Sequence, residues 1–452
     1  MKSYFTLALL FIGSVALGQN TEAGGAYSLD ECIQFALENN KNIQNAQLGF
    51  EASRYKVGEI LADGLPQINA SADLGYNFKV PTSFIPAEFF GGEPGTFSPV
   101  QFSPAYNGTA SLNLNQMIFD GSYFVGLKAS RTYTELSRKE KIKSEIDVVA
   151  DVSKAYYLAL VNKDRLELIE RNYARVDSLY RETQIMFENG FAEKIDVSRI
   201  KVQLNNLSVE KNNFQNTLEL SYAILKFQMG MDVNEAISLK DRIEDVQFEA
   251  LADDFGNDFN YDDRIEFSLL NTNLDLVKLD IKNTTVRYLP KLDLYGRLGA
   301  STGAGSYSDL MNFGDNWFGF GVVGLQLNVP VFDGMRKSKQ IQQKRAQVDQ
   351  IENSQDIMRK NIDLEIKTAR DNLKKSVDNL IAQKENMELA EDVYKVTKIK
   401  YGEGIGSNLE VVEGDAAFKE AQTNYYNALY EALVAKIELE KAYGKLWNEN
   451  NK

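Results

Sequence analysis

The sequence has 452 residues, of which 44% are hydrophobic and 25% are charged, and its formal net charge is −14. This length allows one large domain or a few ordinary ones, and the negative charge argues against nucleic acid or an anionic membrane surface as a partner. The chain has no histidine and one cysteine, which excludes a Ser-His-Asp triad, a Cys-His dyad, a histidine-based zinc site and an internal disulfide. We expect no catalytic residues, no cofactor and no metal.

Residues 1–18 predict an export signal that is cleaved off. Lys2 gives the positive start, and the apolar run that follows it falls within the ~7–15 residues of a secretory signal. Ala16 and Gly18 fit a small-x-small cleavage site. A membrane anchor is the alternative, but the run is too short to span a bilayer, and no other stretch approaches the ~18 apolar residues of a spanning helix. We expect Cys32 to be a small buried hydrophobe, since it does not follow the cleavage site.

The rest of the chain contains an internal repeat. Phe-Asp-Gly occurs at 119–121 and again at 332–334, and Gly190 and Gly404 follow these tripeptides at nearly equal separations. Agreement of this kind over much of each half indicates a duplication. A Leu-Pro pair ends the first helix of each half, because proline disfavours helix in the residue before it. The two prolines are Pro66 and Pro290.

Each half is predicted to contain the same elements in the same order. The first repeat, residues 19–230, comprises a helix over 29–63, a strand over 66–80, a loop over 81–107, a strand over 108–119, a long helix over 121–188, a tip turn at 189–194 and a helix over 195–230. An acidic equatorial connector over 231–260 leads to the second repeat, residues 261–452. That repeat comprises a helix over 262–288, a strand over 290–301, a loop over 302–316, a strand over 317–330, a long helix over 334–401, a tip turn at 402–407 and a helix over 408–446.

The predicted strands alternate apolar and polar residues. In the first, every second residue from Ile68 to Val80 is apolar, and this run of thirteen residues exceeds the ~5–6 of a typical strand. It is long enough to cross the ~25 Å apolar band of an outer-membrane barrel. A soluble, half-buried sheet is the alternative, and the export signal favours the membrane. Because a barrel needs at least about 8 strands and lipid tolerates no open edge, the chain must oligomerise. Two copies would give eight strands and three would give twelve.

The helices are unusually long. Residues 121–188 and 334–401 contain few helix breakers, and a helix of ~65 residues is about 100 Å long. The returning helix of the first half carries a heptad stripe from Val197 to Leu225. The matching face of the second half consists largely of small residues, which let helices approach closely. The predicted fold is therefore mainly α, with duplicated long-helix coiled coils and four β-strands per chain.

These features together resemble the TolC family of outer-membrane efflux channels. The resemblance covers essentially the whole chain after the export signal, and it rests on the duplicated order, the Leu-Pro joints, the Phe-Asp-Gly joints and the two glycine turns. It implies a homotrimer with a twelve-stranded barrel in outer-membrane lipid and a helical α-barrel through the periplasm, closed at its tip. It also implies a passive conduit for small molecules or proteins, coupled to a periplasmic adaptor (membrane fusion) protein and an inner-membrane pump of the RND, ABC or MFS type.

The stretch YGEGIGSNLEVVEGD at 401–415 then has an interpretation. Glycine takes the left-handed conformations that a tight helix-to-helix turn needs, which places Gly190 and Gly404 at the two tip turns. Glu410 and Glu413 are three residues apart and project from one helix face. The resemblance aligns them with an acidic constriction ring, in which six carboxylates of a trimer would attract cations. The alternative is that Glu410, Glu413 and Asp415 form a solvated helix face.

The resemblance also implies a latch at the tip. Tyr401 aligns with a tip tyrosine of the family, and Asp196 aligns with its hydrogen-bond acceptor on the neighbouring coil; a packed aromatic is the alternative for Tyr401. The family often carries an arginine two residues after the turn glycine, where this chain has Gly406. The latch is then either weaker or completed by Lys194 or Arg199.

Other residues at the turns and joints are candidates for structural roles. Phe191 and Ile405 are either ordinary apolar staples or contacts for an adaptor tip. The remaining candidates are the strand–helix joints at Pro66, Pro290, Asp120, Gly121, Asp333 and Gly334.

Three other functions compete with the conduit. A periplasmic adaptor of coiled-coil type would carry one helical hairpin beside lipoyl-like domains, whereas this chain carries two hairpins. A secreted glycosidase with paired carboxylates would need a compact pocket, which 65-residue helices do not suggest. A trimeric coiled-coil adhesin would not need the duplicated strand pairs.

Overall fold

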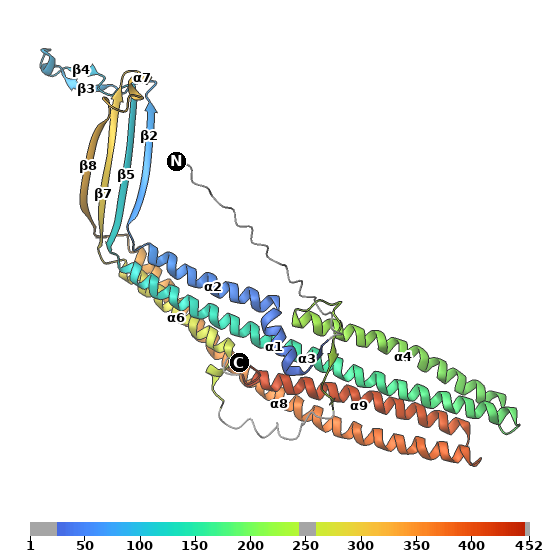
Figure 1. Cartoon of the computed structure of the whole chain (residues 1–452). Coiled ribbons are helices and arrows are strands. Elements are labelled where there is room, and N and C mark those ends of the chain that lie inside the picture. Colours follow the sequence, from blue (N-terminus) through green and yellow to red (C-terminus); the bar gives the residue numbers. More distant parts are fainter. Residues whose placement is uncertain (1–24, 244–258, 448–452) are drawn as a thin grey trace, which may run out of the picture. The chain divides into compact units, whose positions relative to one another are not determined.

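The computed structural model describes residues 25–243 and 259–447, so the predicted export signal lies outside the described residues. In each half, helix precedes the strands and two long helices follow them, in the predicted order (Figure 1). The elements are β1 Ala26–Tyr27, α1 Leu29–Asn39, α2 Lys41–Ala62, β2 Gln67–Tyr76, β3 Ser83–Pro86, η1 Ala87–Phe90, β4 Phe97–Val100, β5 Tyr106–Phe119, α3 Gly121–Glu188, α4 Lys194–Met229, β6 Ser238–Leu239, η3 Tyr261–Asp263, α6 Ile265–Val286, β7 Lys291–Ala304, α7 Tyr307–Leu310, β8 Phe318–Asn328, α8 Arg336–Gly402 and α9 Asn408–Ala442.

The chain divides into two compact units, and both units draw on both sequence repeats. The helical unit is formed by the described parts of 1–41, 147–255 and 370–439. The sheet unit is formed by the described parts of 42–146, 256–369 and 440–452. The division cuts across the repeats because α3 and α8, with 68 and 67 residues, are each long enough to contribute one end to either unit.

The sheet unit contains one antiparallel sheet in the order β2-β5-β7-β8, which Figure 1 shows as four adjacent strands. The register aligns Ile68 with Leu114, Leu114 with Gly296 and Gly296 with Val323. It equally aligns polar Asn69 with Asn113 and Asn113 with Arg297 on the other face. Because side chains alternate along a strand, the sheet has one apolar and one largely polar face.

The apolar face of this sheet is solvent-exposed in the single chain. Large side chains on it are roughly one half to three quarters exposed, and they are Ile68, Leu74, Leu112, Leu298, Val323, Leu325 and Leu327. A continuous exposed apolar surface of this kind is unusual for a protein that works alone in water and marks an interaction surface. Strands β2 and β8 lie at the two edges of the sheet, each with one side unpaired within it.

The prediction of one helix over 29–63 is wrong, because this range forms two separate helices, α1 and α2. Asn40 between them is buried and has an extended backbone. Its side-chain amide donates a hydrogen bond to the carbonyl of Gln228 at 2.7 Å. The end of α4 packs tightly here, since a Cβ at Gly230 would lie 2.8 Å from the carbonyl oxygen of Asn39. This contact with α4 fixes the break, and apolar periodicity carries no sign of it.

Other element boundaries differ from the predictions by a few residues. The predicted strand over 66–80 ends earlier, at Tyr76, and the strand over 290–301 continues to Ala304. The predicted loop over 81–107 holds the short hairpin β3–β4 and a 3-10 turn, because Gly91 and Gly95 allow local reversals at positive φ. The connector is not structureless, since β6 pairs in parallel with β1; its residues 244–258 lie outside the described ranges.

In the helical unit the four long helices pack around one apolar cluster. It is formed by Val176, Leu179, Ile200, Leu204, Leu207, Tyr394, Val411 and Phe418. The heptad stripe predicted on the returning helix supplies its α4 members. Cys32 is fully buried, as expected, and burial raises the pKa of its thiol to about 12. Within 25–243 and 259–447 no helix combines the length and the apolar character needed to cross a membrane.

Candidate functional site

The two helical hairpins reverse through the same backbone motif. In the first, Gly190 (φ 80°) donates its N–H to Phe187 O, and the Phe191 N–H bonds to Met186 O. In the second, Gly404 (φ 73°) bonds to Tyr401 O, and the Ile405 N–H bonds to Lys400 O. Both are Schellman motifs, which need a left-handed residue after the helix and therefore favour glycine. The turn roles predicted for Gly190 and Gly404 thus have a physical basis in the backbone.

The residue after each turn glycine is apolar and exposed. Phe191 is 80% exposed and Ile405 is 78% exposed. In a Schellman motif the residue at this position commonly packs back on the preceding helix, and neither side chain is covered in that way. The two tips therefore present a matched pair of uncovered apolar side chains.

Glu410 and Glu413 lie at the start of α9, and both are exposed in the single chain. The backbone N–H of Glu410 donates to Ser407 Oγ at 3.2 Å, so Ser407 caps this helix. A carboxylate in the first turn also interacts favourably with the helix dipole. Glu410 thus has a local structural role, whatever its carboxylate does in an assembly.

The predicted hydrogen bond between Tyr401 and Asp196 is not formed. Asp196 accepts the backbone N–H of Glu193 at 3.2 Å and lies 3.8 Å from Arg199. The Tyr401 hydroxyl is buried and has no hydrogen-bond partner among the described residues. The physical reason is local: Asp196 is the third residue of α4, and its carboxylate is turned back to cap the helix start. Of the two substitute cations, Arg199 is therefore the one near Asp196.

Asp415 joins three helices through a buried ion-pair cluster. Its side chain is only 3% exposed. Arg175 of α3 donates from Nη2 to Asp415 Oδ1 at 2.7 Å, and Lys419 Nζ of α9 lies 2.7 Å from Oδ2. Gln203 of α4 also donates to Oδ2. We call these four residues the Asp415 cluster.

Aromatic rings of the second hairpin complete the surroundings of Arg175. Its guanidinium carbon lies 4.4 Å from the ring centroid of Tyr394 and 5.3 Å from that of Phe418. Such contacts between a cation and a ring face are attractive, more so where water is excluded. Burial raises the pKa of Tyr394, whose hydroxyl has no hydrogen-bond partner within the described ranges. The cluster therefore ties the α3–α4 hairpin to the α8–α9 hairpin through charge, hydrogen bonds and ring contacts.

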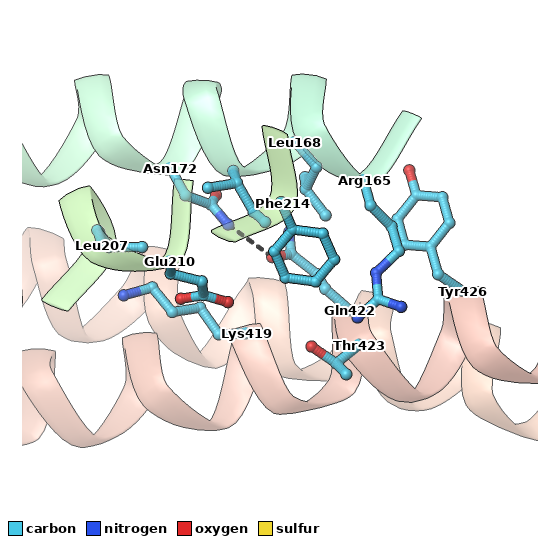
Figure 2. A pocket seen from close by; sticks show the side chains of 11 residues that line it. Arg165, Leu168, Asn172, Leu207, Glu210, Phe214, Lys419, Gln422, Thr423 and Tyr426 are labelled. Carbon is cyan, nitrogen blue, oxygen red and sulfur yellow. Dashed lines mark hydrogen bonds between the residues drawn. The ribbon is translucent and has the colours of Figure 1, made fainter. Parts of the chain in front are cut away.

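Further polar contacts continue along the same helices. Asn172 of α3 donates to Gln422 of α9 at 2.9 Å, and Figure 2 shows this bond with Phe214 of α4 and Arg165 of α3 beside it. The guanidinium of Arg165 lies 4.6 Å from the Phe214 ring centroid. The cavity between these side chains has a volume of about 20 Å³, enough for about one water molecule. Its size makes it a packing defect and not a substrate pocket.

Sequence reasoning missed the Asp415 cluster. Asp415 was grouped with Glu410 and Glu413 as part of a solvated face, yet it is buried. It lies four residues after Val411 and three before Phe418, and both of these belong to the apolar cluster. That spacing puts Asp415 on the buried stripe of the helix, so the helical periodicity of the sequence indicated that Asp415 is buried.

In the two Phe-Asp-Gly joints the aspartates have the same role, whereas the glycines are required for different reasons. Asp120 accepts the Ser122 N–H at 2.7 Å, and Asp333 accepts the Lys337 N–H at 3.1 Å, so each caps the helix that follows. Gly334 has φ 67°, whereas Gly121 is needed for space, since a Cβ there would lie 3.0 Å from the Cβ of Val286.

The two Leu-Pro joints match each other. Pro66 directly precedes β2, and Pro290 directly precedes β7. The leucine before each proline closes the end of the preceding helix by donating its N–H, Leu65 to Ala62 O and Leu289 to Val286 O, both at 3.0 Å.

Comparison with known proteins assigns the two halves to one family. The profile of the outer membrane efflux protein family matches residues 32–230 and 271–445, one segment within each predicted repeat. Outer membrane protein TolC of Vibrio cholerae is 21% identical over 439 residues, covering 97% of this chain and 95% of that protein. The toluene efflux pump outer membrane protein TtgC of Pseudomonas putida is 23% identical over 431 residues, covering 93% and 84%. Among solved structures, the CmeC outer membrane channel of Campylobacter jejuni superimposes with a TM-score of 0.69 at 16% identity, covering 99% and 95%.

Proposed function

Because this chain belongs to the outer membrane efflux protein family, we propose that three copies form one channel through the outer membrane and periplasm. The channel is a passive conduit that carries small molecules or proteins outward and does no chemistry of its own. A periplasmic adaptor would join it to an inner-membrane pump of the RND, ABC or MFS type, which supplies the energy. The adaptor function considered for the sequence is not favoured, since the family match spans two complete hairpins.

The observation that carries this proposal is the two-faced sheet with open edges. Four strands with an exposed apolar face and a polar face cannot stand alone in lipid, because both edges would leave backbone groups unpaired. Pairing β8 of one copy with β2 of the next removes both edges. Three copies then give twelve strands, with the apolar face toward lipid and the polar face toward the lumen.

We assign the periplasmic gate to the start of α9. Glu410 and Glu413 are exposed and adjacent on one helix face, so three copies would bring six carboxylates to the narrow end of the tunnel. Their repulsion raises the free energy of closure. The Asp415 cluster offsets it by holding the α8–α9 hairpin against the α3–α4 hairpin, in the place of the absent Tyr401–Asp196 bond.

We assign the opening movement to the second hairpin, which carries Glu410 and Glu413. Both hairpins hold polar groups that are buried without hydrogen-bond partners among the described residues. In the first hairpin they belong to Arg175, Thr183 and Gln203, and in the second to Tyr394, Tyr401 and Asn408. Each such group costs about 1–3 kcal/mol relative to a hydrated one. Movement of α8 and α9 that hydrates these groups would recover part of that cost and favour opening.

We assign adaptor docking to the tips. Phe191 and Ile405 are uncovered at equivalent positions, and exposed apolar side chains at such sites suit contact with another protein. An apolar groove of about 560 Å³ lies between α4 and α9, on the helices that follow the two tips, and is lined by Ile195, Val202 and Val412 among others.

Single-channel recording in planar bilayers tests the channel and its gate together. We expect wild type to give a small cation-selective conductance, and Glu410→Gln/Glu413→Gln to enlarge it or reduce its selectivity. Glu385→Gln/Glu388→Gln is the matched control, because these glutamates have the same spacing, lie on α8 and are exposed. Equal changes in both double variants would reject the gate assignment, and absence of conductance from folded protein would reject the channel.

A further inference from the structure

A basic cavity lies in the sheet unit where strands meet helices. Its volume is about 540 Å³. It is lined by Ser122, Arg287, Leu289, Lys291, Asn328, Pro330, Arg336, Lys337 and Gln340. Four of these nine side chains are cationic and none is acidic, in a chain whose net charge is −14. A concentration of positive charge in an acidic protein calls for an explanation.

Two of the four cations are already neutralised by the joint aspartates. Lys291 forms an ion pair with Asp120, and Lys337 lies 2.8 Å from Asp333. The hydrogen bond from Lys337 lowers the pKa of Asp333, which keeps this carboxylate ionised. These pairs hold the joints together and leave the lysines little capacity for another anion.

The two arginines are different. Arg287 follows α6 and Arg336 begins α8, and neither forms an ion pair or a side-chain hydrogen bond within 25–243 and 259–447. Ser122 Oγ, also on the cavity wall, is buried and has no hydrogen-bond partner in the same ranges. The described part of the cavity therefore offers two guanidinium groups that form no ion pair and one unused hydroxyl. Of the two arginines, Arg336 still helps to lower the pKa of the Asp333 carboxyl, whereas Arg287 does not.

We propose that this cavity binds a phosphate group. Guanidinium groups match the oxygens of phosphate in paired hydrogen bonds, and the Ser122 hydroxyl can donate a further one. The first turns of α3 and α8 adjoin the cavity, and their partial positive charge also favours an anion. An uncharged or cationic ligand would leave both arginines without an ion-pair partner.

The cavity opens at the base of the polar face of the sheet. Lys291 and Asn328 are directly paired across β7 and β8, on the same face as Asp293 and Arg297. If the proposed channel is correct, this face lines the lumen, so the phosphate belongs to a soluble anion within the channel and not to a lipid. Binding itself does not depend on that assembly, so the two proposals can fail separately.

Hydrogen exchange of the purified full-length protein in detergent micelles tests the site. We expect inorganic phosphate, compared with chloride at equal ionic strength, to slow exchange in residues 286–292 and 334–340. Arg287→Gln/Arg336→Gln should weaken the apparent affinity about tenfold, since each partly exposed charge contact contributes up to a few-fold. Ser122→Ala, a small change that is less disruptive to the fold, should weaken it about threefold.

The matched control is Lys282→Gln/Arg345→Gln, which removes the same charge from exposed positions on α6 and α8 outside the cavity. This variant should bind phosphate as wild type does. A second arm replaces phosphate with nanodiscs of phosphatidylglycerol or phosphatidylcholine. Protection by phosphatidylglycerol alone would keep a phosphate site and make a lipid headgroup its source. No protection by either ligand, or equal loss in both double variants, would overturn the proposal.

Discussion

The two hairpin tips have the same backbone and different side chains. Both α3–α4 and α8–α9 reverse through a Schellman motif at a left-handed glycine followed by an exposed apolar residue. Ten residues beyond the glycine, the first hairpin has bulky Ile200 and the second has Gly414, where a Cβ would lie 3.1 Å from Thr397 Oγ1. One residue later, exposed Lys201 in the first hairpin corresponds to buried Asp415 in the second.

This difference shows which features a duplication has to keep. The turn depends on a backbone conformation that few residues other than glycine adopt, so Gly190 and Gly404 retain it. The side chains beyond the turn only have to pack, and they were free to diverge. The second hairpin thereby acquired closer helix packing, a buried charge and an acidic start, all within about the first two turns of α9.

Among the variants of the two hairpins, Asp415→Asn should lower the free energy of unfolding most. Removing one charge of a buried ion pair costs about 3–5 kcal/mol, because the remaining cations lose their compensation. Lys201→Gln, at the equivalent exposed position, should cost well under 1 kcal/mol. Thermal unfolding followed by far-ultraviolet circular dichroism measures both, and similar midpoints for the two variants would show that the Asp415 cluster does not stabilise the unit.

Valine at each turn glycine gives the next largest effect. A side chain in the left-handed conformation costs about 1–2 kcal/mol, so Gly190→Val and Gly404→Val should lower the unfolding midpoint by similar amounts. Gly402→Ala is the control, because Gly402 ends α8 with ordinary φ and open space around it, and alanine favours helix. A large difference between the two valine variants would mean that the turns are not equivalent.

Tyr394→Phe should have the smallest effect at neutral pH, and its sign should be stabilising. The variant removes a buried hydroxyl without a partner in the described residues, for a gain of about 1 kcal/mol, the lower end of the cost of burying such a group. Burial raises the pKa of Tyr394, so the neutral form is favoured in the folded state. The free energy of unfolding is therefore unaffected by this titration below the unfolded pKa of about 10, and it falls as pH rises from there toward the higher folded pKa.

This prediction is tested by measuring the unfolding midpoints of wild type and Tyr394→Phe at about pH 7 and about pH 10.5. Wild type should lose more stability than Tyr394→Phe over that interval, since only wild type retains the phenol. The neutral-pH measurement serves as the internal control. Equal losses in the two proteins would assign the alkaline sensitivity to other groups.

Long elements with strong local patterns were predictable from the sequence. The predicted helix over 121–188 has the same ends as α3, because glycine marks both of them. Cys32 was placed correctly by its helical spacing. The family resemblance is confirmed by the match over both halves.

Features that depend on tertiary contacts were not predictable in the same way. The break at Asn40 is set by the end of α4, which is distant in the sequence. The Asp196 carboxylate accepts a hydrogen bond from the backbone at the start of its own helix and not from Tyr401. A motif alignment does not distinguish between these two partners. Asp415 was the avoidable miss, since its spacing from Val411 and Phe418 indicated burial. The gate and docking assignments remain proposals.

The exposed apolar face and the unpaired edges of β2 and β8 have a consequence for how the protein is made. If the proposed channel is correct, a newly exported chain must cross an aqueous compartment before it meets two other copies in a membrane. During that time its open edges can pair with any extended chain, which is the route to aggregation. Biogenesis should therefore depend on chaperones that shield this sheet. Overproduction should saturate these chaperones and cause aggregation through the sheet before it affects folding of the helices.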